Sequence, residues 1–362
     1  MNFYKSKEKK MIKCKKLDIK IPPPSLAYGH IINPLVVILA HPDTENWFYS
    51  NYIQLCSMKH PFVYGEEDVE LMNFFPKYFS DFDSFYLRVH NITDDIIDLT
   101  EDNLISHMIE WIEKGYYIQT FLNEGEIPGT YMCSHKIHAL NEQLFYGYNL
   151  EEKVFYITVF NEKDHFSESV ISFEALKKVF FSDKCRELVE QCEWLCVGKK
   201  FGMNLFKFKE YVKYEFNLNV VINSLEDYVN ASNSAENLSW LTQEKKDFVF
   251  GVDVYKSLID WLNLHNNEPV DIRSVFELWD HKKIMYDRIE FLINKGFLTE
   301  KKYLEEYRKI VDLSNDARLL IIKYNIIRKR ELIDRIINTL NELKNKEVPI
   351  LENLIAYLKS CI

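Results

Sequence analysis

The sequence predicts an α+β protein in which a central antiparallel sheet is followed by a C-terminal bundle of helices. Two runs rich in Val, Ile, Phe and Tyr flank a polar turn at residues 149–153, a pattern typical of a β-hairpin. From about residue 236, apolar residues instead recur at the helical period. We therefore expect a basic flexible segment over residues 1–24, a mixed domain over 25–235 and a helical domain over 236–362.

The elements of the mixed domain follow from local patterns. Asp43 or Thr44 is suited to cap a helix that begins directly after it. The spacing of Leu104, Met108 and Ile112 gives a second helix an apolar stripe. Helices are expected at residues 46–55, 68–75, 100–114, 172–180 and 216–231. Strands are expected at residues 35–39, 116–122, 141–148, 154–161 and 197–208.

The C-terminal domain is predicted to be helical almost throughout. Helices are expected at residues 254–264, 274–293, 299–324, 331–343 and 350–358. Gly296, Asn315 and Pro349 are expected to mark breaks, because Gly and Pro punctuate helices and Asn favours turns.

The composition excludes several classes of function. The chain has 362 residues, 47% of them hydrophobic, which suits a large folded core. Its net charge of −10 argues against sequence-independent binding to nucleic acid, which needs clustered Lys and Arg. The lysine-rich N-terminus is interpreted as a solvated tail, with a contact arm as the alternative. No apolar run approaches the ~20 residues that span a bilayer, so we expect no membrane association.

Cysteine and histidine usage predicts neither a metal centre nor a cofactor. Seven cysteines without a signal peptide favour a reducing, cytoplasmic location. The Cys-Glu-Trp-Leu-Cys segment lacks a second pair at zinc-finger spacing. A metal site at His135 and His138 would need a third ligand, for which His165 and Glu142 are the candidates. Neither of the common Gly-rich phosphate-binding motifs is present.

Several segments resemble a known family. A helix near residues 47–55 follows a short apolar segment, and a later segment reads His138-x-x-Asn-Glu-x-Leu-Phe-Tyr-Gly-Tyr-Asn149. The strand at 154–160, the segment Ile-Ser-Phe-Glu-Ala-Leu and the helical segment 271–288 follow in order. Together they resemble the butirosin-biosynthesis-protein-H-like group within the broad C39 (papain-like) cysteine peptidase clan.

The resemblance implies a papain-like mixed domain with a Cys-His-Asp/Asn site for acyl transfer. Such a site needs a thiolate at a helix N-terminus, a His that accepts its proton, and an Asp or Asn that orients the His. The nucleophile belongs at Asn46 or Trp47, the His at Asn141 and the orienting group at Asn161. Only Asn161 suits its role, so we reject peptidase activity.

Two substitute arrangements stay open. Ser50, one turn into the helix, could act as nucleophile with His138 as its base, and Cys133 could pair with a nearby His. The plainer alternatives are a hydroxyl on a helix face and a loop histidine. Cys56 is expected at the far end of the helix, where the helix dipole opposes a thiolate.

Three functions are compatible with these residues. The first is acyl transfer or amide formation in secondary-metabolite (nonribosomal peptide or polyketide) biosynthesis, acting on an acyl thioester held by a carrier protein. The second is a catalytically inactive homologue, a pseudoenzyme, that binds a carrier protein, peptide or metabolite in the same cleft. There Trp47, Tyr131 and Tyr148 would contact an apolar ligand, unless they belong to the core. The third is a helical interaction module. An acyl or peptidyl carrier protein is the expected partner, and a homo-oligomer is compatible with the sequence.

Overall fold

The chain forms two compact units. The computed structural model describes residues 12–59, 63–64, 67–68, 72–75, 84–93, 96–192, 202–237, 248–265 and 267–362. The sheet unit comprises residues 1–23, 33–41 and 79–212, and the helical unit comprises residues 24–32, 42–78 and 213–362. Both units are discontinuous in sequence, whereas the sequence suggested one boundary near residue 235.

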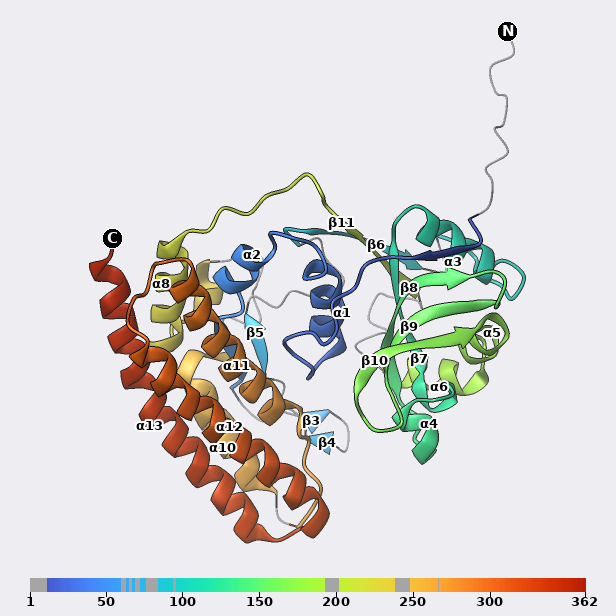
Figure 1. The fold of residues 1–362 in the computed structure, drawn as a ribbon. Coiled ribbons are helices and arrows are strands. Elements are labelled where there is room, and N and C mark those ends of the chain that lie inside the picture. The colour runs from blue at the N-terminus through green and yellow to red at the C-terminus, as the bar shows by residue number, and fades with distance from the viewer. Residues whose placement is uncertain are drawn as a thin grey trace. The chain divides into compact units, whose positions relative to one another are not determined.

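A seven-stranded antiparallel sheet forms the centre of the sheet unit (Figure 1). Its strands are β1 (Cys14–Lys16), β6 (Leu87–Thr93), β7 (Tyr117–Asn123), β8 (Leu140–Asn149), β9 (Val154–Phe160), β10 (Phe166–Ser172) and β11 (Gly202–Phe208). They lie in the order β10-β9-β8-β7-β11-β6, and β1 pairs with β8. The predicted hairpin is confirmed as β8 and β9, with an irregularity between Phe145 and Gly147. Gly147 lies so close to the backbone of Lys15 that a larger side chain would collide with it.

Helices α3 (Leu104–Glu113) and α5 (Phe173–Phe180) pack on the sheet, and α6 (Asp183–Gln191) follows them. Met108 of α3, Leu176 of α5 and Phe145 of β8 belong to one buried core. The helix α5 begins after Ser172 because the Ser172 hydroxyl accepts a hydrogen bond from the Ala175 amide at 3.1 Å. The helix predicted at 172–180 is therefore confirmed, and the one predicted at 100–114 is confirmed over residues 104–113.

The segment predicted as a strand at 35–39 is instead part of helix α1 (Gly29–Ile38), which contains Pro34. The four residues from Leu35 to Ile38 are all fully buried. A segment that is apolar on every side shows neither a helical nor a strand period, and this explains the wrong prediction.

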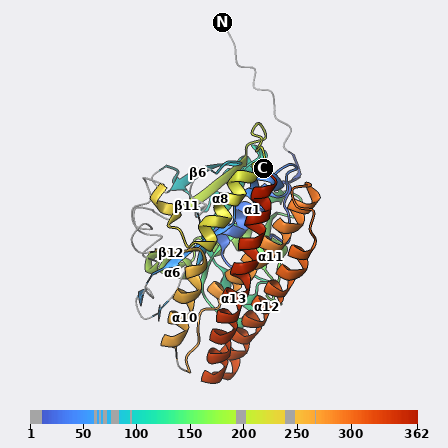
Figure 2. The ribbon, with the colours of Figure 1, turned by 90° about the vertical axis from the view of Figure 1, so that its left-hand side faces the viewer.

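The helical unit combines long helices with two small antiparallel sheets (Figures 1 and 2). Its helices are α2 (Glu45–Ser50), α8 (Leu218–Val229), α10 (Val254–Leu264), α11 (Arg273–Asn294), α12 (Lys302–Ile327) and α13 (Arg330–Ser360), with short 3-10 helices η2 (Ser234–Asn237) and η3 (Gly251–Asp253). One sheet has the order β12 (Phe248–Phe250), β2 (Gln54–Met58) and β5 (Asn73–Phe75), and β3 (Val63–Tyr64) pairs with β4 (Glu67–Asp68). No helix among the described residues is long and apolar enough to cross a membrane.

The breaks predicted between the C-terminal helices are right at one position of three. Gly296 ends α11 in the left-handed region, with φ +79°. Asn315, by contrast, lies inside α12, and Pro349 lies inside α13. The helices predicted at 331–343 and 350–358 are thus one continuous helix.

The helix predicted at 46–55 is observed as α2 and ends five residues early, at Ser50. We attribute this to Arg288 of α11, which binds backbone carbonyl groups at the end of α2 and just after it. The Arg288 guanidinium, 1% exposed, donates to the carbonyl oxygens of Tyr49 (2.9 Å), Asn51 (2.7 Å) and Tyr52 (2.9 Å). Tyr52 takes the left-handed conformation, with φ 52°. The chain then turns into β2 instead of continuing α2.

Three further predicted segments are only partly covered by the described residues. The helix predicted at 68–75 is wrong where it is described, because residues 73–75 form β5 and pair with β2; residues 69–71 lie outside the described residues. The strand predicted at 197–208 is β11 from Gly202, and residues 197–201 are likewise outside the description. Of the segment expected to be flexible, residues 1–11 are not described, whereas residues 14–16 form β1.

Candidate functional site

The residues predicted to form one site belong to both units. Asn46, Trp47 and Ser50 lie on α2 in the helical unit. The remaining predicted positions, His138, Asn141, Asn161, Tyr131 and Tyr148, lie in the sheet unit.

On α2, the hydroxyl of Ser50, the predicted substitute nucleophile, is hydrogen-bonded within the helix. Ser50 is 2% exposed, and its hydroxyl donates to the Asn46 carbonyl at 2.7 Å. Trp47 is also 2% exposed and meets the edge of the Tyr52 ring with centroids 5.7 Å apart. Cys56, expected at the end of this helix, is a fully buried residue of β2. Neither the Ser50 hydroxyl nor the Cys56 thiol is therefore accessible to a substrate.

Asn141, at the position where the resemblance implies a His, holds a buried carboxylate. Its side-chain amide donates to Oε2 of Glu124, which belongs to the 3-10 helix η1 (Glu124–Glu126) directly after β7. Glu124 is 1% exposed. Its Oε1 atom has no hydrogen-bond partner among the described residues. Burial raises the pKa of Glu124, the Asn141 amide opposes that shift, and Asp164 adds to it.

Sequence reasoning did not single out Glu124. The register places Leu122 opposite Asn141 across β7 and β8, so the residue two positions beyond Leu122 lies near the start of β8. Glu124 can be recognised as the neighbour of Asn141 only when the register between β7 and β8 is known, and the sequence alone does not give this register.

The other predicted polar groups of this unit are tied into local turns. The exposed His138 accepts a hydrogen bond at Nδ1 from the Asn123 amide at 3.0 Å. Oδ1 of Asn161 accepts from the backbone amides of Lys163 (3.0 Å) and His165 (3.2 Å), and its Nδ2 donates to the Ser167 hydroxyl of β10 at 3.2 Å. Asn161 therefore organises the turn between β9 and β10 rather than orienting a histidine.

The predicted ligand-contacting aromatics of this unit differ in environment. Tyr148 is fully buried, with its hydroxyl 3.0 Å from the Ile12 carbonyl and 3.2 Å from Oε1 of Glu113. Tyr131 is partly exposed on helix α4 (Tyr131–His135), where its ring stacks on His135 with centroids 4.0 Å apart. Only Tyr131 presents a ring to solvent.

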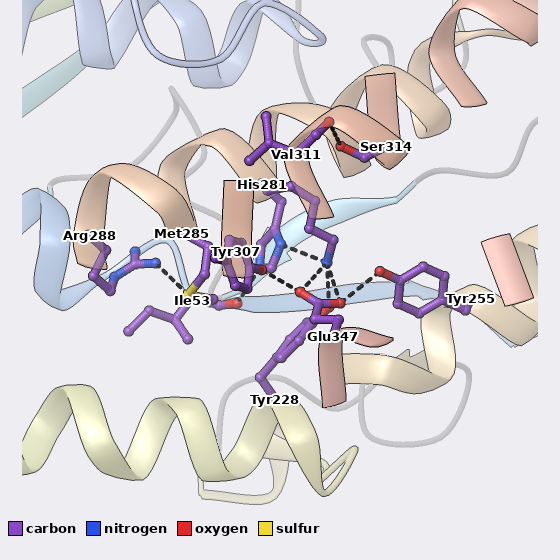
Figure 3. A network of polar contacts seen from close by, with 11 residues as sticks. Ile53, Tyr228, Tyr255, His281, Met285, Arg288, Tyr307, Val311, Ser314 and Glu347 are labelled. Atoms are coloured by element: carbon purple, nitrogen blue, oxygen red, sulfur yellow. Dashed lines mark hydrogen bonds and ion pairs between the residues drawn. The ribbon is translucent and has the colours of Figure 1, made fainter. Parts of the chain in front are cut away.

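The helical unit holds a buried ionic network that the sequence did not reveal (Figure 3). Lys282 of α11 and Glu347 of α13 are both fully buried, with 2.8 Å between Nζ and Oε1. The hydroxyls of Tyr228 (3.1 Å) and Tyr255 (2.7 Å) donate to Oε2 of Glu347, and that of Tyr307 donates to Oε1. The five side chains come from α8, α10, α11, α12 and α13, so the network joins the five long helices that the structure describes in this unit.

Every proton donor in this network has an acceptor. The Lys282 ammonium donates to Glu347, to the Tyr228 hydroxyl (2.7 Å) and to Nδ1 of His281 (3.1 Å). Nε2 of His281 donates to the Ile53 carbonyl at 2.8 Å, which fixes the proton on that nitrogen. Burial lowers the pKa of His281, and the neighbouring Lys282 charge lowers it further. A closed and fully buried network of this kind serves the fold rather than a substrate.

An open groove of about 430 Å³ lies between α11 and α12 of the same unit. The Trp279 ring lies between two cations, Nζ of Lys283 at 3.9 Å and Cζ of Arg318 at 4.0 Å from its centroid. Cζ of Arg308 lies 5.5 Å from the centroid of Tyr286. The groove therefore combines aromatic rings with three cationic groups, and the carboxylates of Asp287 and Asp312 also line it.

The cations of this groove differ in their ion pairs. Lys283 lies 3.0 Å from the Asp280 carboxylate, and Arg308 lies 3.8 Å from that of Asp312. Arg318 instead donates from Nε to the side-chain oxygen of Asn315 at 3.0 Å. Among the described residues, no carboxylate forms an ion pair with Arg318, although the charge of Asp280 acts on it and opposes the lowering of the Arg318 pKa by burial. It is the guanidinium best placed to receive an anion from outside the chain.

Comparisons with known proteins add little to this geometry. No family model matches the chain. Over 179 residues the chain is 24% identical to a MATH and LRR domain-containing protein of Plasmodium falciparum. The alignment covers 42% of this chain and 2% of the length of that protein.

Proposed function

We propose that this protein is a catalytically inactive papain-like homologue that binds an acyl or peptidyl carrier protein of a biosynthetic pathway. The observation that supports the lack of catalytic activity is the hydrogen bond between Asn141 and Glu124. An amide cannot accept a proton near neutral pH, and this one is already donating to a buried carboxylate. The papain-like relation and the cytoplasmic location are parts of the same proposal.

The environment of Ser50 argues against acyl transfer through the substitute pair. A nucleophilic hydroxyl needs a base within about 3 Å. The Ser50 hydroxyl, at 2% exposure, donates to a backbone carbonyl. His138 accepts a hydrogen bond from Asn123 in the sheet unit. Binding without a covalent step is therefore the function that these contacts support best.

The groove between α11 and α12 is the proposed docking site on the helical unit. A carrier protein would bring its acidic side chains to Arg318, while the partly exposed side chains of Trp279 and Tyr286 line the same groove and would add apolar contact. Arg and Trp are the residue types that carry most of the energy in protein interfaces. The resemblance supplies the identity of the partner, and the groove supplies a surface of suitable chemistry.

A binding titration tests this proposal. Isothermal calorimetry with an acyl carrier protein should detect binding to the wild-type protein, and Arg318→Ala should weaken it by at least about tenfold, the cost of a hot-spot residue. Lys309→Ala is the matched control, because Lys309 is an exposed cation of α12 outside the groove. Equal binding by both variants would reject the groove, and no binding by the wild type would reject the carrier partner.

A further inference from the structure

A second open groove, of about 480 Å³, lies between α12 and α13. α12 contributes Asp316, Leu319 and Lys323, and α13 contributes Arg335 and Glu342. The two helices are antiparallel, since the Tyr303 hydroxyl near the start of α12 donates to the Asn353 carbonyl near the end of α13. Figure 2 shows the two helices side by side.

The charges of this groove are separated along its length. Lys323 lies five residues before Arg328, and Arg335 lies six residues after Lys329, so both bases are near the turn between the helices. Asp316 and Glu342 are each a further seven residues away (323 − 316 and 342 − 335). Seven residues are about two helical turns, or roughly 10 Å. One end of the groove is therefore basic and the other acidic.

Apolar side chains project from the same stripe of α12. Leu319 is 50% exposed, and Ile326, seven residues later, is 77% exposed. The neighbouring Ile327 is 43% exposed. Leu319 lines the groove, and exposed apolar side chains at this helical spacing are suited to a contact with another protein.

The charged groups are available for a partner. Among the described residues, Asp316, Lys323 and Arg335 have no ion pair. Glu342 pairs with Lys346, but both side chains are about half exposed, at 49% and 59%. Such a surface pair contributes little and exchanges readily for a better one.

We propose that this face of α12 and α13 docks a second copy of the same chain. Two copies related by a twofold axis present the same surface to each other. Consider a twofold axis that lies in the plane of the contact and is perpendicular to α12 and α13. This axis places Asp316 opposite the partner's Lys323 and Glu342 opposite the partner's Arg335. Leu319 then lies near the axis. An axis parallel to the helices would instead bring acids against acids, so the charge pattern selects the first arrangement.

A charge-reversal pair tests the dimer. The variant Asp316→Lys/Glu342→Lys makes the groove wholly basic, and the variant Lys323→Glu/Arg335→Glu makes it wholly acidic. Sedimentation over a concentration series should show a wild-type dimer, and each variant alone should dissociate with a dissociation constant raised more than about tenfold. An equimolar mixture of the two variants should restore a dimer, because their grooves are complementary.

Two further variants keep the test interpretable. Glu305→Lys/Lys309→Glu reverses two exposed charges of α12 outside the groove and should dimerise like the wild type. Leu319→Asp should give a monomer with unchanged circular dichroism. A monomeric wild type at every concentration, dimers formed by each reversed variant alone, or a mixture that stays monomeric would overturn the proposal. Monomers that instead capture an amphipathic helix of another protein would assign the face to a different partner.

Discussion

The ammonium of Lys282 lies 2.8 Å from the carboxylate of Glu347, and neither side chain is exposed to solvent. The pair stands at the centre of the helical unit, surrounded by three tyrosine hydroxyls that donate to the carboxylate. Burial lowers the pKa of Lys282, while Glu347 opposes that shift. The stability of the unit therefore depends on keeping both partners.

Removal of one partner of this pair should destabilise the fold strongly. Lys282→Met leaves the Glu347 carboxylate buried without its counter-charge, which costs about 3–5 kcal/mol. Lys282→Met/Glu347→Gln should be less destabilised than Lys282→Met, since the neutral amide oxygen still accepts from the tyrosines. Urea denaturation followed by circular dichroism measures both, with Lys309→Met, expected within about 0.5 kcal/mol of the wild type, as the surface control. A double variant that is as unstable as Lys282→Met, or more so, would contradict this prediction.

Arg288 should be equally hard to replace. Arg288→Ala leaves the carbonyls of Tyr49, Asn51 and Tyr52 without their donor, and we expect a loss of about 3–5 kcal/mol, because each orphaned buried group costs about 1–3 kcal/mol. Arg288→Lys should fall between, since one ammonium cannot reproduce the planar fork. The same denaturation experiment ranks the three proteins. Equal stability of the Lys variant and the wild type would contradict the capping role.

Glu124 should make the sheet unit less stable as pH rises. A carboxyl group whose pKa is raised in the folded state binds more protons there, so stability falls between the unfolded and folded pKa values. Glu124→Gln removes this titration. Its stability relative to the wild type should grow from pH 4 to pH 7, by about 1.4 kcal/mol for each unit of the raised pKa. Denaturation midpoints of both proteins at several pH values check the sign, and a difference independent of pH would count against it.

Pro349 offers a stabilising change. It lies on the exposed side of the continuous helix α13, where it lacks an amide proton and disturbs the preceding turn. Pro349→Ala should raise stability by about 1–3 kcal/mol and increase the melting temperature. A lower melting temperature would indicate that the chain needs a break at this position.

The fold could be predicted from the sequence where local patterns decide it. The hairpin β8–β9 and the helices α3, α5 and α11 carry clear periodicity, and all were expected close to their observed bounds. The sequence failed where distant residues decide the structure. The end of α2 depends on Arg288, more than 230 residues away, and no local signal announces it. The break predicted at Pro349 was wrong because a long helix packed on its neighbours tolerates one exposed proline.

In the candidate sites, too, local sequence patterns were predictable and contacts between distant residues were not. The replacement of the expected His by Asn141 could be read from the sequence, but its buried partner Glu124 depends on strand register. The Lys282–Glu347 network was hidden because charged residues of α11 occupy positions that helical period assigns to the core. A buried charge is recognisable only when its partner on another helix is known.

Intact-protein mass spectrometry after incubation with an acyl-thioester carrier protein and a candidate amine tests the central claim most directly. We predict that the protein mass stays unchanged and that no amide product forms, while the carrier still binds. An increase in mass by the acyl group that disappears in Ser50→Ala or Cys133→Ala would contradict it, because it would identify a working nucleophile.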